Sequence, residues 1–215
     1  MVVMGVDLRA SPKRSSTVVV LDKHSSLSYV GSFVDDEELA QLARSLQPQL
    51  ISIGTPLSLP LGLCCLEPSH PCNLTVPHRK GRLLELELAR MRISCFFTNK
   101  GSIIRNLIYR GIELRKRLRE SDFEVIEVYP HATKVILFGD KIPPKKSAAS
   151  LVFFQESLEP LIGCIGSYMA GMDRNGCDAV LNAYTGFLHT QNETDVLGSE
   201  EEGTLVLPKL PKIFG

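Results

Sequence analysis

Short apolar runs separated by polar turns occupy the first quarter of the chain. Three of them predict β-strands, and their short connections are typical of an antiparallel meander: residues 2–9, 16–21 and 27–34. Asp35 and Asp36 are suited to cap a helix that ends at Pro48. The apolar run 50–53 follows, and because a helix leads into it, we expect this strand to lie parallel to the first.

Helical spacing of apolar residues dominates the rest of the chain. The pattern predicts helices at residues 81–91, 103–118, 132–138, 151–168 and 177–189, the fourth with a kink at Pro160. Residues 123–128 predict a fifth strand, again parallel to the first, and residues 94–98 a short strand or extended segment. Residues 205–207 predict an added edge strand that Pro208 stops.

These elements together predict an α/β fold. Its mixed five-stranded sheet joins a three-strand antiparallel meander to two parallel strands, with helices on both faces. Because 215 residues suffice for one domain, we expect residues 1–215 to form a single unit. Residues 57–80 are rich in Pro, Cys, His and Leu and lack a clear period, so we expect a loop insertion that packs as a flap.

Composition narrows the functional classes. A net charge of zero, with 44% hydrophobic and 22% charged residues, is ordinary for a globular protein and implies no overall attraction to nucleic acid or membranes. An anionic ligand must therefore be held by local charge. The sequence shows no signal-peptide pattern and no apolar run near the roughly 18–20 residues of a membrane span. We expect a cytoplasmic protein whose six cysteines are mostly reduced.

Three carboxylates stand at positions that such a sheet brings together. Asp7 and Glu127 come at the ends of parallel strands, beyond which ligands bind, and Asp178 falls in the first turn of the last predicted helix. Clustered carboxylates need a counter-charge, and oxygen ligands suit one or two Mg²⁺ or Mn²⁺ ions. Two ions about 4 Å apart would fit phosphodiester hydrolysis. The alternative is that Asp7 only caps the turn after its strand.

Basic side chains are candidates for binding the phosphate backbone of a nucleic acid. They are Lys100, Arg105 and Lys134, and such contacts would make binding depend on salt. The alternative for the basic helix 103–119 is a solvated face balanced by acids elsewhere. The motifs GxxxxGK[ST], GxGxxG and GxSxG do not occur, which argues against nucleotide binding through such loops and against a serine nucleophile.

Several short motifs, spread in order over nearly the whole chain, resemble one family. They are GVDLRAS (5–11), TPLSLP (55–60), GRLLELELARMRISCFFT (81–98), EVYP (127–130), CDAVLNAYTGFLH (177–189) and EEGTLVLP (201–208). In these motifs the chain resembles the DUF429 family of predicted nucleases, whose expected fold is RNase H-like. The resemblance implies a hydrolase in which Asp7, Glu127 and Asp178 form the acidic, metal-binding cluster.

One position departs from the family pattern. The sequences of the family's members resemble the pattern Ile-Asp-x-Pro at the end of the fourth strand. This chain has IGTP (53–56) there, so the acid expected at Gly54 is absent. Glu85 and Glu67 are candidate substitutes. Otherwise the protein is a catalytically degenerate module that binds nucleic acid or protein. A third alternative is a phosphotransferase similar to actin-like and sugar-kinase domains, which would need a homodimer because the chain is short.

Cysteine and histidine residues gather in the 57–80 insertion, namely Cys64, Cys65, His70, Cys72 and His78. Zinc favours such ligands at short spacing, so a structural Zn²⁺ at Cys64, His70 and Cys72 is one interpretation. Against it, Cys64 and Cys65 are adjacent and no C-x₂-C pair occurs. The alternatives are buried thiols with surface histidines, or oxidation of Cys64 or Cys65 with Cys72. The remaining cysteines are expected in the core: Cys95, Cys164 and Cys177.

Overall fold

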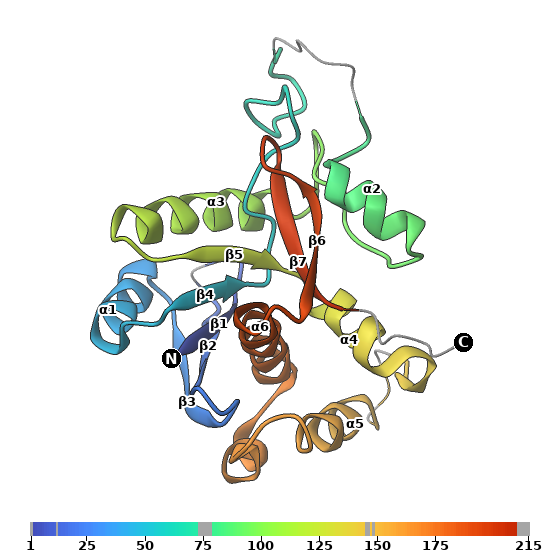
Figure 1. The fold of residues 1–215 in the computed structure, drawn as a ribbon. Helices are drawn as coiled ribbons and strands as arrows, with labels where there is room; N and C mark the ends of the chain where they lie inside the picture. Colours follow the sequence, from blue (N-terminus) through green and yellow to red (C-terminus); the bar gives the residue numbers. More distant parts are fainter. Residues whose placement is uncertain (1, 12, 73–78, 145–146, 148, 210–215) are drawn as a thin grey trace.

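The computed structural model describes residues 2–11, 13–72, 79–144, 147 and 149–209. They form a mixed sheet of seven strands in the order β3-β2-β1-β4-β5-β7-β6 (Figure 1). The strands are β1 (Val3–Asp7), β2 (Ser16–Leu21), β3 (Leu27–Phe33), β4 (Leu50–Ile53), β5 (Val125–Val128), β6 (Thr194–Ser199) and β7 (Gly203–Pro208).

The first five strands confirm the predicted meander and the two parallel additions. β2 pairs antiparallel with both β1 and β3, whereas β4 pairs parallel with β1 and β5 pairs parallel with β4. In this register Val6 lies opposite Ile53, and Ile53 lies opposite Glu127. Because β1, β4 and β5 run the same way, the residues at their C-terminal ends meet at one edge of the sheet.

A C-terminal β-hairpin extends the sheet beyond the five predicted strands. β7 pairs parallel with β5 and antiparallel with β6, so the strand predicted at 205–207 is confirmed, but its predicted place at the edge is wrong because β6 forms that edge. Nothing in the sequence TDVLGS suggested β6, because Asp and Gly are depleted in strands and Asp195 and Val196 are exposed. The three buried apolar residues of β7 make this strand predictable from the sequence, but its pairing with β5 depends on the tertiary fold.

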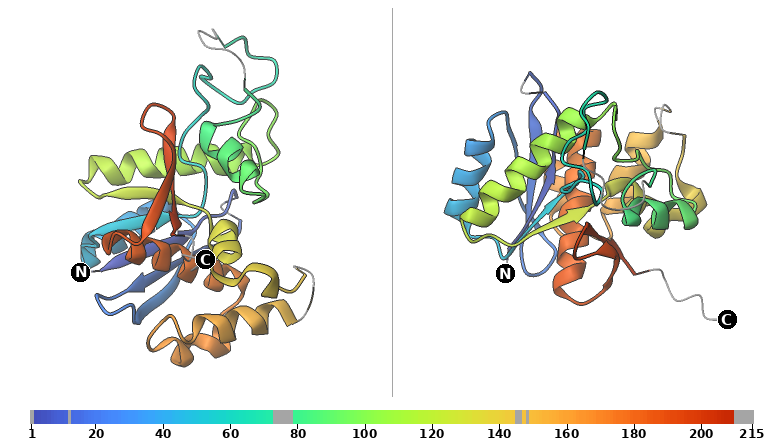
Figure 2. Two further views of the ribbon diagram at one scale, coloured as in Figure 1. Left: turned by 45° about the vertical axis from the view of Figure 1, so that its right-hand side comes forward. Right: turned by 90° about the horizontal axis from the view of Figure 1, so that it is seen from above.

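Helices cover both faces of the sheet, as predicted. α1 (Asp36–Leu46) and α3 (Arg105–Glu120) pack on one face, and α6 (Arg174–Thr190) with α5 (Ala149–Leu158) packs on the other (Figures 1 and 2). α2 (Leu83–Arg90) and α4 (Pro130–Phe138) share a third apolar cluster with β7. Within the described part of the chain, no helix combines the length and apolar character that crossing a membrane requires.

Some local predictions fail for identifiable reasons. The helix predicted at 151–168 is confirmed only up to Leu158, where α5 ends just before Pro160, and the predicted continuation is wrong because a separate 3-10 segment η2 (Ile165–Gly171) follows. A short 3-10 turn, η1 (Gly139–Lys141), follows α4. Residues 94–98 form no strand. Of the three cysteines expected in the core, Cys177 is buried but Cys95 is half-buried and Cys164 is exposed.

α6 begins three residues earlier than predicted. Asp173 is its N-cap, and the Asp173 carboxylate accepts a hydrogen bond of 2.8 Å from the backbone N–H of Gly176. Asp178 is therefore the fifth residue of α6, in its second turn, and the expected placement in the first turn is wrong. The helix dipole consequently contributes less to the stability of the Asp178 charge than a first-turn position would.

Candidate active site

A cavity of about 770 Å³ opens at the C-terminal ends of β1, β4 and β5. Asp7 is the last residue of β1, Gly54 directly follows β4, and Glu127 lies in β5. All three line the cavity, and so does Asp178 from α6. The edge of the sheet that the strand order predicts as a ligand site is thus hollow and carries the three expected carboxylates.

Small residues let α6 approach β1 closely enough to bring Asp178 to Asp7. A Cβ at Gly5 would overlap the backbone of Ala179 and Ala183 in α6. Ala179 and Ala183 are fully buried, and they face β1 on the side from which Asp178 reaches the cavity. Glycine at position 5 is therefore a requirement of the helix–sheet distance on which the carboxylate pair depends.

Asp7 is an unusual carboxylate because it is largely buried beside another acid. Burial raises the pKa of Asp7, and repulsion from Asp178 adds to the effect. Arg9, whose Nη2 lies 3.8 Å from Asp7 Oδ2, and Lys134 act in the opposite direction. The net result is a pKa of about 7 for Asp7. A cation beside Asp7 would relieve the penalty on its charged form.

Lys134 is the close cationic partner of Asp178 among the described residues. The ammonium of Lys134 pairs with Asp178 Oδ1 and lies 4.4 Å from the ring centroid of Phe154, which holds the lysine from the other side. Apart from this ion pair, the buried Asp178 Oδ1 has no hydrogen-bond partner. The Asp7–Asp178 pair is thus only partly compensated by the protein itself.

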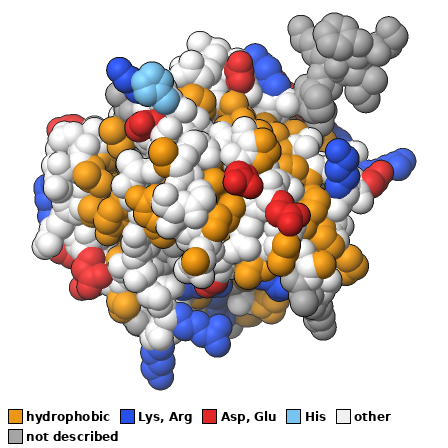
Figure 3. Space-filling view, turned by 90° about the horizontal axis from the view of Figure 1, so that it is seen from below, with side chains coloured by type: hydrophobic (Ala, Val, Ile, Leu, Met, Phe, Trp, Pro, Cys, Tyr) orange, Lys and Arg blue, Asp and Glu red, His pale blue; other side chains and the backbone are white. Residues whose placement is uncertain are grey.

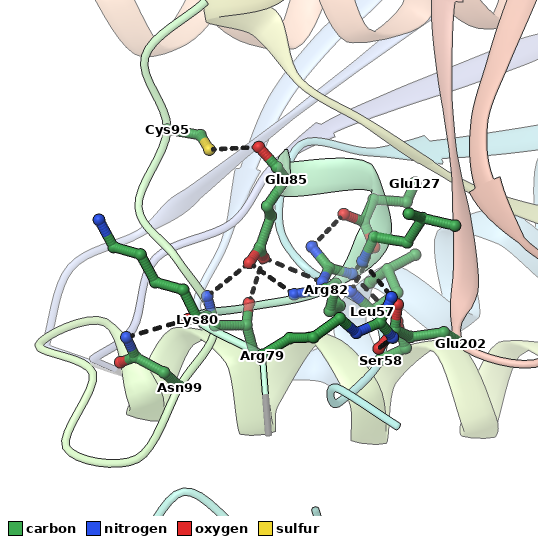
Figure 4. A network of polar contacts seen from close by, with 12 residues as sticks. Leu57, Ser58, Arg79, Lys80, Arg82, Glu85, Cys95, Asn99, Glu127 and Glu202 are labelled. Atoms are coloured by element: carbon green, nitrogen blue, oxygen red, sulfur yellow. Dashed lines mark hydrogen bonds and ion pairs between the residues drawn. The ribbon is translucent and has the colours of Figure 1, made fainter. Parts of the chain in front are cut away.

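Glu127 belongs to a separate, fully satisfied network around a buried arginine (Figure 4). Arg82 is only 1% exposed and donates to both carboxylate oxygens of Glu127, at 2.7 Å each. It also donates to Glu85 Oε1 at 3.0 Å and to Ser58 Oγ at 3.0 Å. Burial alone would lower the pKa of the Arg82 guanidinium, but Glu127 and Glu85 outweigh burial and raise it. The arginine is therefore charged and held as a bidentate partner.

This network changes the expectation for the metal ligands. Glu127 Oε2 also accepts a hydrogen bond of 2.7 Å from Leu57 N, and Glu85 accepts from the N–H and the hydroxyl of Thr98 at 2.8 and 2.5 Å. Both glutamates therefore already have donors on their oxygens. Among the residues the structure describes, the carboxylates do not converge on one point as a metal-binding group of three.

The position of the missing acid is filled by a side chain from α6. A Cβ at Gly54 would overlap Nδ2 of Asn182. That Nδ2 donates a hydrogen bond of 2.9 Å to Val6 O, which also accepts from Gly54 N at 3.0 Å. The Oδ1 of Asn182 is buried without a hydrogen-bond partner. Asn182 thus occupies the space into which an acid at position 54 would extend.

Of the basic residues predicted to bind phosphate, Lys134 lines the cavity and the other two do not. Lys100 donates to His70 O, and Arg105 Nη1 lies 3.3 Å from Glu67 Oε2. Both therefore contact the 57–80 insertion. Glu67 is outside the cavity lining as well, whereas Glu85 belongs to it.

Several further residues of the cavity lining were not predicted from the sequence, among them Arg9, Arg82, Arg174 and Asn175. Arg9 donates to Asn175 Oδ1, and Arg174 lies beside Asn175 on α6, so this corner of the cavity is polar and cationic. Only the spacing of Asp7 and Arg9 in the GVDLRAS motif hinted at it. For Arg82, the sequence offered only Glu85, three residues later, as a sign of an ion pair. Arginine is rarely buried, and its other partner, Glu127, is distant in sequence, so a buried role for Arg82 was not expected.

Comparison with known proteins addresses the fold. No protein-family model matches the chain, and no curated protein matches its sequence. Among solved structures, Thermus thermophilus RuvC matches with a TM-score of 0.50 and 11% sequence identity, over 89% of this chain and 97% of that chain. The chain has the RNase H-like fold. At this identity the likeness concerns the fold alone, so membership of the DUF429 family stays a prediction.

The cavity lies at one edge of the five strands that make up the RNase H-like part of the sheet. This part, β3-β2-β1-β4-β5, carries Asp7, Gly54 and Glu127 on adjacent parallel strands, and the β6–β7 hairpin is an addition beside β5. Glu202, in the turn of that hairpin, accepts hydrogen bonds from Leu61 N at 2.7 Å and Leu83 N at 2.6 Å. The added hairpin is thereby attached to Leu61, near the start of the 57–80 insertion, and to Leu83, the first residue of α2 after it.

Proposed function

We propose that the protein is a divalent-metal-dependent nuclease. Asp7 and Asp178 would hold the metal ion at which the phosphodiester bond of the nucleic acid is cleaved. The observation that carries the proposal is this pair of adjoining, incompletely neutralised carboxylates in a cavity at the carboxyl edge of an RNase H-like sheet. The motifs that resemble predicted nucleases support it, and so does the fold shared with RuvC. Fold alone does not decide function, so the argument depends on the chemistry of the cavity.

The donor set fits a hard divalent cation. Asp7 and Asp178 offer oxygen ligands, which suit Mg²⁺ or Mn²⁺. Burial and then repulsion from Asp178 raise the pKa of Asp7, and a bound cation would favour its charged form. When bound, such an ion would activate water or stabilise the leaving oxygen. Because Glu127 is engaged by Arg82, we propose one ion held by Asp7 and Asp178, with Glu127 positioning Arg82 at the cavity wall.

Cationic side chains around the cavity suit a phosphate backbone. Arg9, Lys134 and Arg174 line it together with the two aspartates. By contrast, Lys and Arg lie mainly at the rim of the face seen from below in Figure 3, on the side of α5 and α6. We therefore propose that nucleic acid approaches through the cavity mouth, with local charge compensating for the zero net charge of the chain.

Cleavage of labelled DNA and RNA, single- and double-stranded, by the full chain with Mg²⁺ or Mn²⁺ tests the proposal. We expect metal-dependent cleavage that falls at least about a hundredfold in Asp7→Asn and in Asp178→Asn, because a ligand contributes more than the outer-shell partners whose loss costs 10–100-fold. Asp195→Asn, on the exposed edge strand β6, is the matched control and should cleave normally. Cleavage retained by Asp7→Asn would overturn the assignment.

A second function is favoured by a different observation. Asn182 fills the place of the missing acid, and Arg82 neutralises Glu127, so two positions that would bind metal are closed. A module of this kind would bind nucleic acid without cutting it. Salt-dependent binding of the same substrates, with no cleavage under any metal and no effect of Asp7→Asn, would support this second function and refute the first. Homodimer formation and a cytoplasmic location stay predictions.

A further inference from the structure

Four metal-ligating side chains meet in the insertion between β4 and α2, away from the carboxylates. They are Cys64, Cys65, His70 and Cys72, whose ligand atoms all lie within 4.8 Å of one another. The Sγ atoms of Cys64 and Cys72 are 3.2 Å apart, and His70 Nδ1 lies 3.7 Å from Cys64 Sγ and 3.9 Å from Cys72 Sγ. In the described part of the chain, this is the one group of three or more His, Cys, Asp or Glu side chains whose ligand atoms lie this close together.

The distances agree with tetrahedral zinc ligation. Zn–S bonds of about 2.3 Å and Zn–N bonds of about 2.0–2.1 Å place neighbouring ligand atoms about 3.5–3.8 Å apart around the ion. The two distances from His70 Nδ1, 3.7 and 3.9 Å, are slightly longer than the about 3.5 Å expected between nitrogen and sulfur, and the Cys64–Cys72 distance of 3.2 Å is shorter than the about 3.8 Å expected between two sulfurs, so small side-chain shifts would complete the site. Adjacency of Cys64 and Cys65 was the main argument against zinc, and the structure removes it, because the Cys65 thiol joins the same group.

A disulfide explains the arrangement less well. The cysteines are free, and 3.2 Å between the Cys64 and Cys72 sulfurs exceeds the roughly 2.05 Å of an S–S bond. A disulfide would also leave the convergence of Cys65 and His70 on the same point without a cause.

The surroundings hold the group in place before any ion arrives. Leu66 is fully buried, its N–H donates to Tyr109 Oη at 2.6 Å, and its carbonyl accepts from Gly101 N at 2.9 Å. Lys100 donates to the carbonyl of His70. Both stretches of chain that bear the ligands are thus attached to α3 and to the segment before it, which reduces the entropy lost on binding an ion.

We propose that Cys64, Cys65, His70 and Cys72 bind a structural Zn²⁺ ion. Four protein ligands leave no open position, which is typical of structural rather than catalytic zinc. On binding, each protonated thiol releases its proton to solvent, and His70 binds through its neutral Nδ1. The ion closes the chain between residues 64 and 72 and fixes the insertion that carries Leu61, whose N–H is bonded to Glu202 in the β6–β7 turn.

Metal content of the full chain, purified under reducing conditions without added chelator, tests the proposal. We expect about one zinc per chain, and on replacement by Co²⁺ the intense visible absorption of a tetrahedral thiolate site. Cys72→Ser and Cys65→Ser should lose the zinc, whereas Cys164→Ser, at an exposed cysteine outside the group, should keep it. His70→Cys preserves four ligands and should retain zinc with an altered cobalt spectrum.

Three outcomes would overturn the proposal. One is a reduced wild-type protein that contains no zinc and takes up none when Zn²⁺ is added. Another is undiminished zinc in Cys72→Ser. The third is a Cys64–Cys72 disulfide found by mass spectrometry in the native protein. If a serine variant fails to fold, removal of zinc from the wild type with a chelator, followed by reloading, gives the same information. Because the readout is metal content, the result is independent of nuclease activity.

Discussion

Replacing Asp7 by Asn should stabilise the protein, and by more at alkaline than at acidic pH. The pKa of this carboxyl is about 7 in the folded protein against 3.8 for an unperturbed aspartate. Between these values the folded state binds the proton more tightly, so the folded protein loses stability as pH rises from about 4 to about 7. Asn is nearly isosteric and carries no charge, so the variant escapes this loss.

The magnitude follows from the shift. Each unit of pKa corresponds to about 1.4 kcal/mol, so the penalty reaches about 4 kcal/mol near pH 8 and falls below about 1 kcal/mol near pH 4. Because the side chain is 15% exposed and solvent screens part of the effect, we expect the free energy of unfolding of Asp7→Asn to exceed that of the wild type by about 2–4 kcal/mol near pH 8. For a chain of this size that raises Tm by several degrees.

Urea unfolding of wild type and variant across this pH range measures the effect. Asp195→Asn, exposed on β6, controls for the removal of a carboxylate and should change little at any pH. Millimolar Mg²⁺ should stabilise the wild type more than Asp7→Asn, because a ligand that binds the folded state raises its stability. A variant that is no more stable than wild type near pH 8, or a gain that does not depend on pH, would refute the reasoning.

Other substitutions test the packing around the cavity, each by urea unfolding. Arg82→Gln should cost about 3–5 kcal/mol, because two buried glutamates lose their counter-charge, and a loss under 1 kcal/mol would contradict this. Gly5→Ala should cost about 1–3 kcal/mol by pushing α6 from the sheet, whereas Gly166→Ala, with open space around it, should not. Gly54→Ala should lower the free energy of unfolding in the wild-type background and lower it much less in an Asn182→Ala background. Strictly additive changes in the two variants would show that the two positions do not compete for space.

The sequence by itself determined the regular elements close to the cavity. Alternating or continuous apolar runs predicted the first five strands, and helical spacing predicted α1, α3 and α6, because these patterns follow from the geometry of one segment against one apolar face. The position of Asp7 at the end of a buried strand, and of Glu127 at the end of another, came from the same local pattern.

Only the tertiary structure decided how those side chains are used. Whether Glu127 is free or neutralised depends on Arg82, 45 residues away. Whether a side chain fits at position 54 depends on Asn182 in α6. The pKa of Asp7 depends on burial by other elements, and the approach of Cys65 to Cys72 depends on how the insertion turns. Local patterns carry no record of these contacts, because segments distant in sequence make them and solvent exclusion sets their strength.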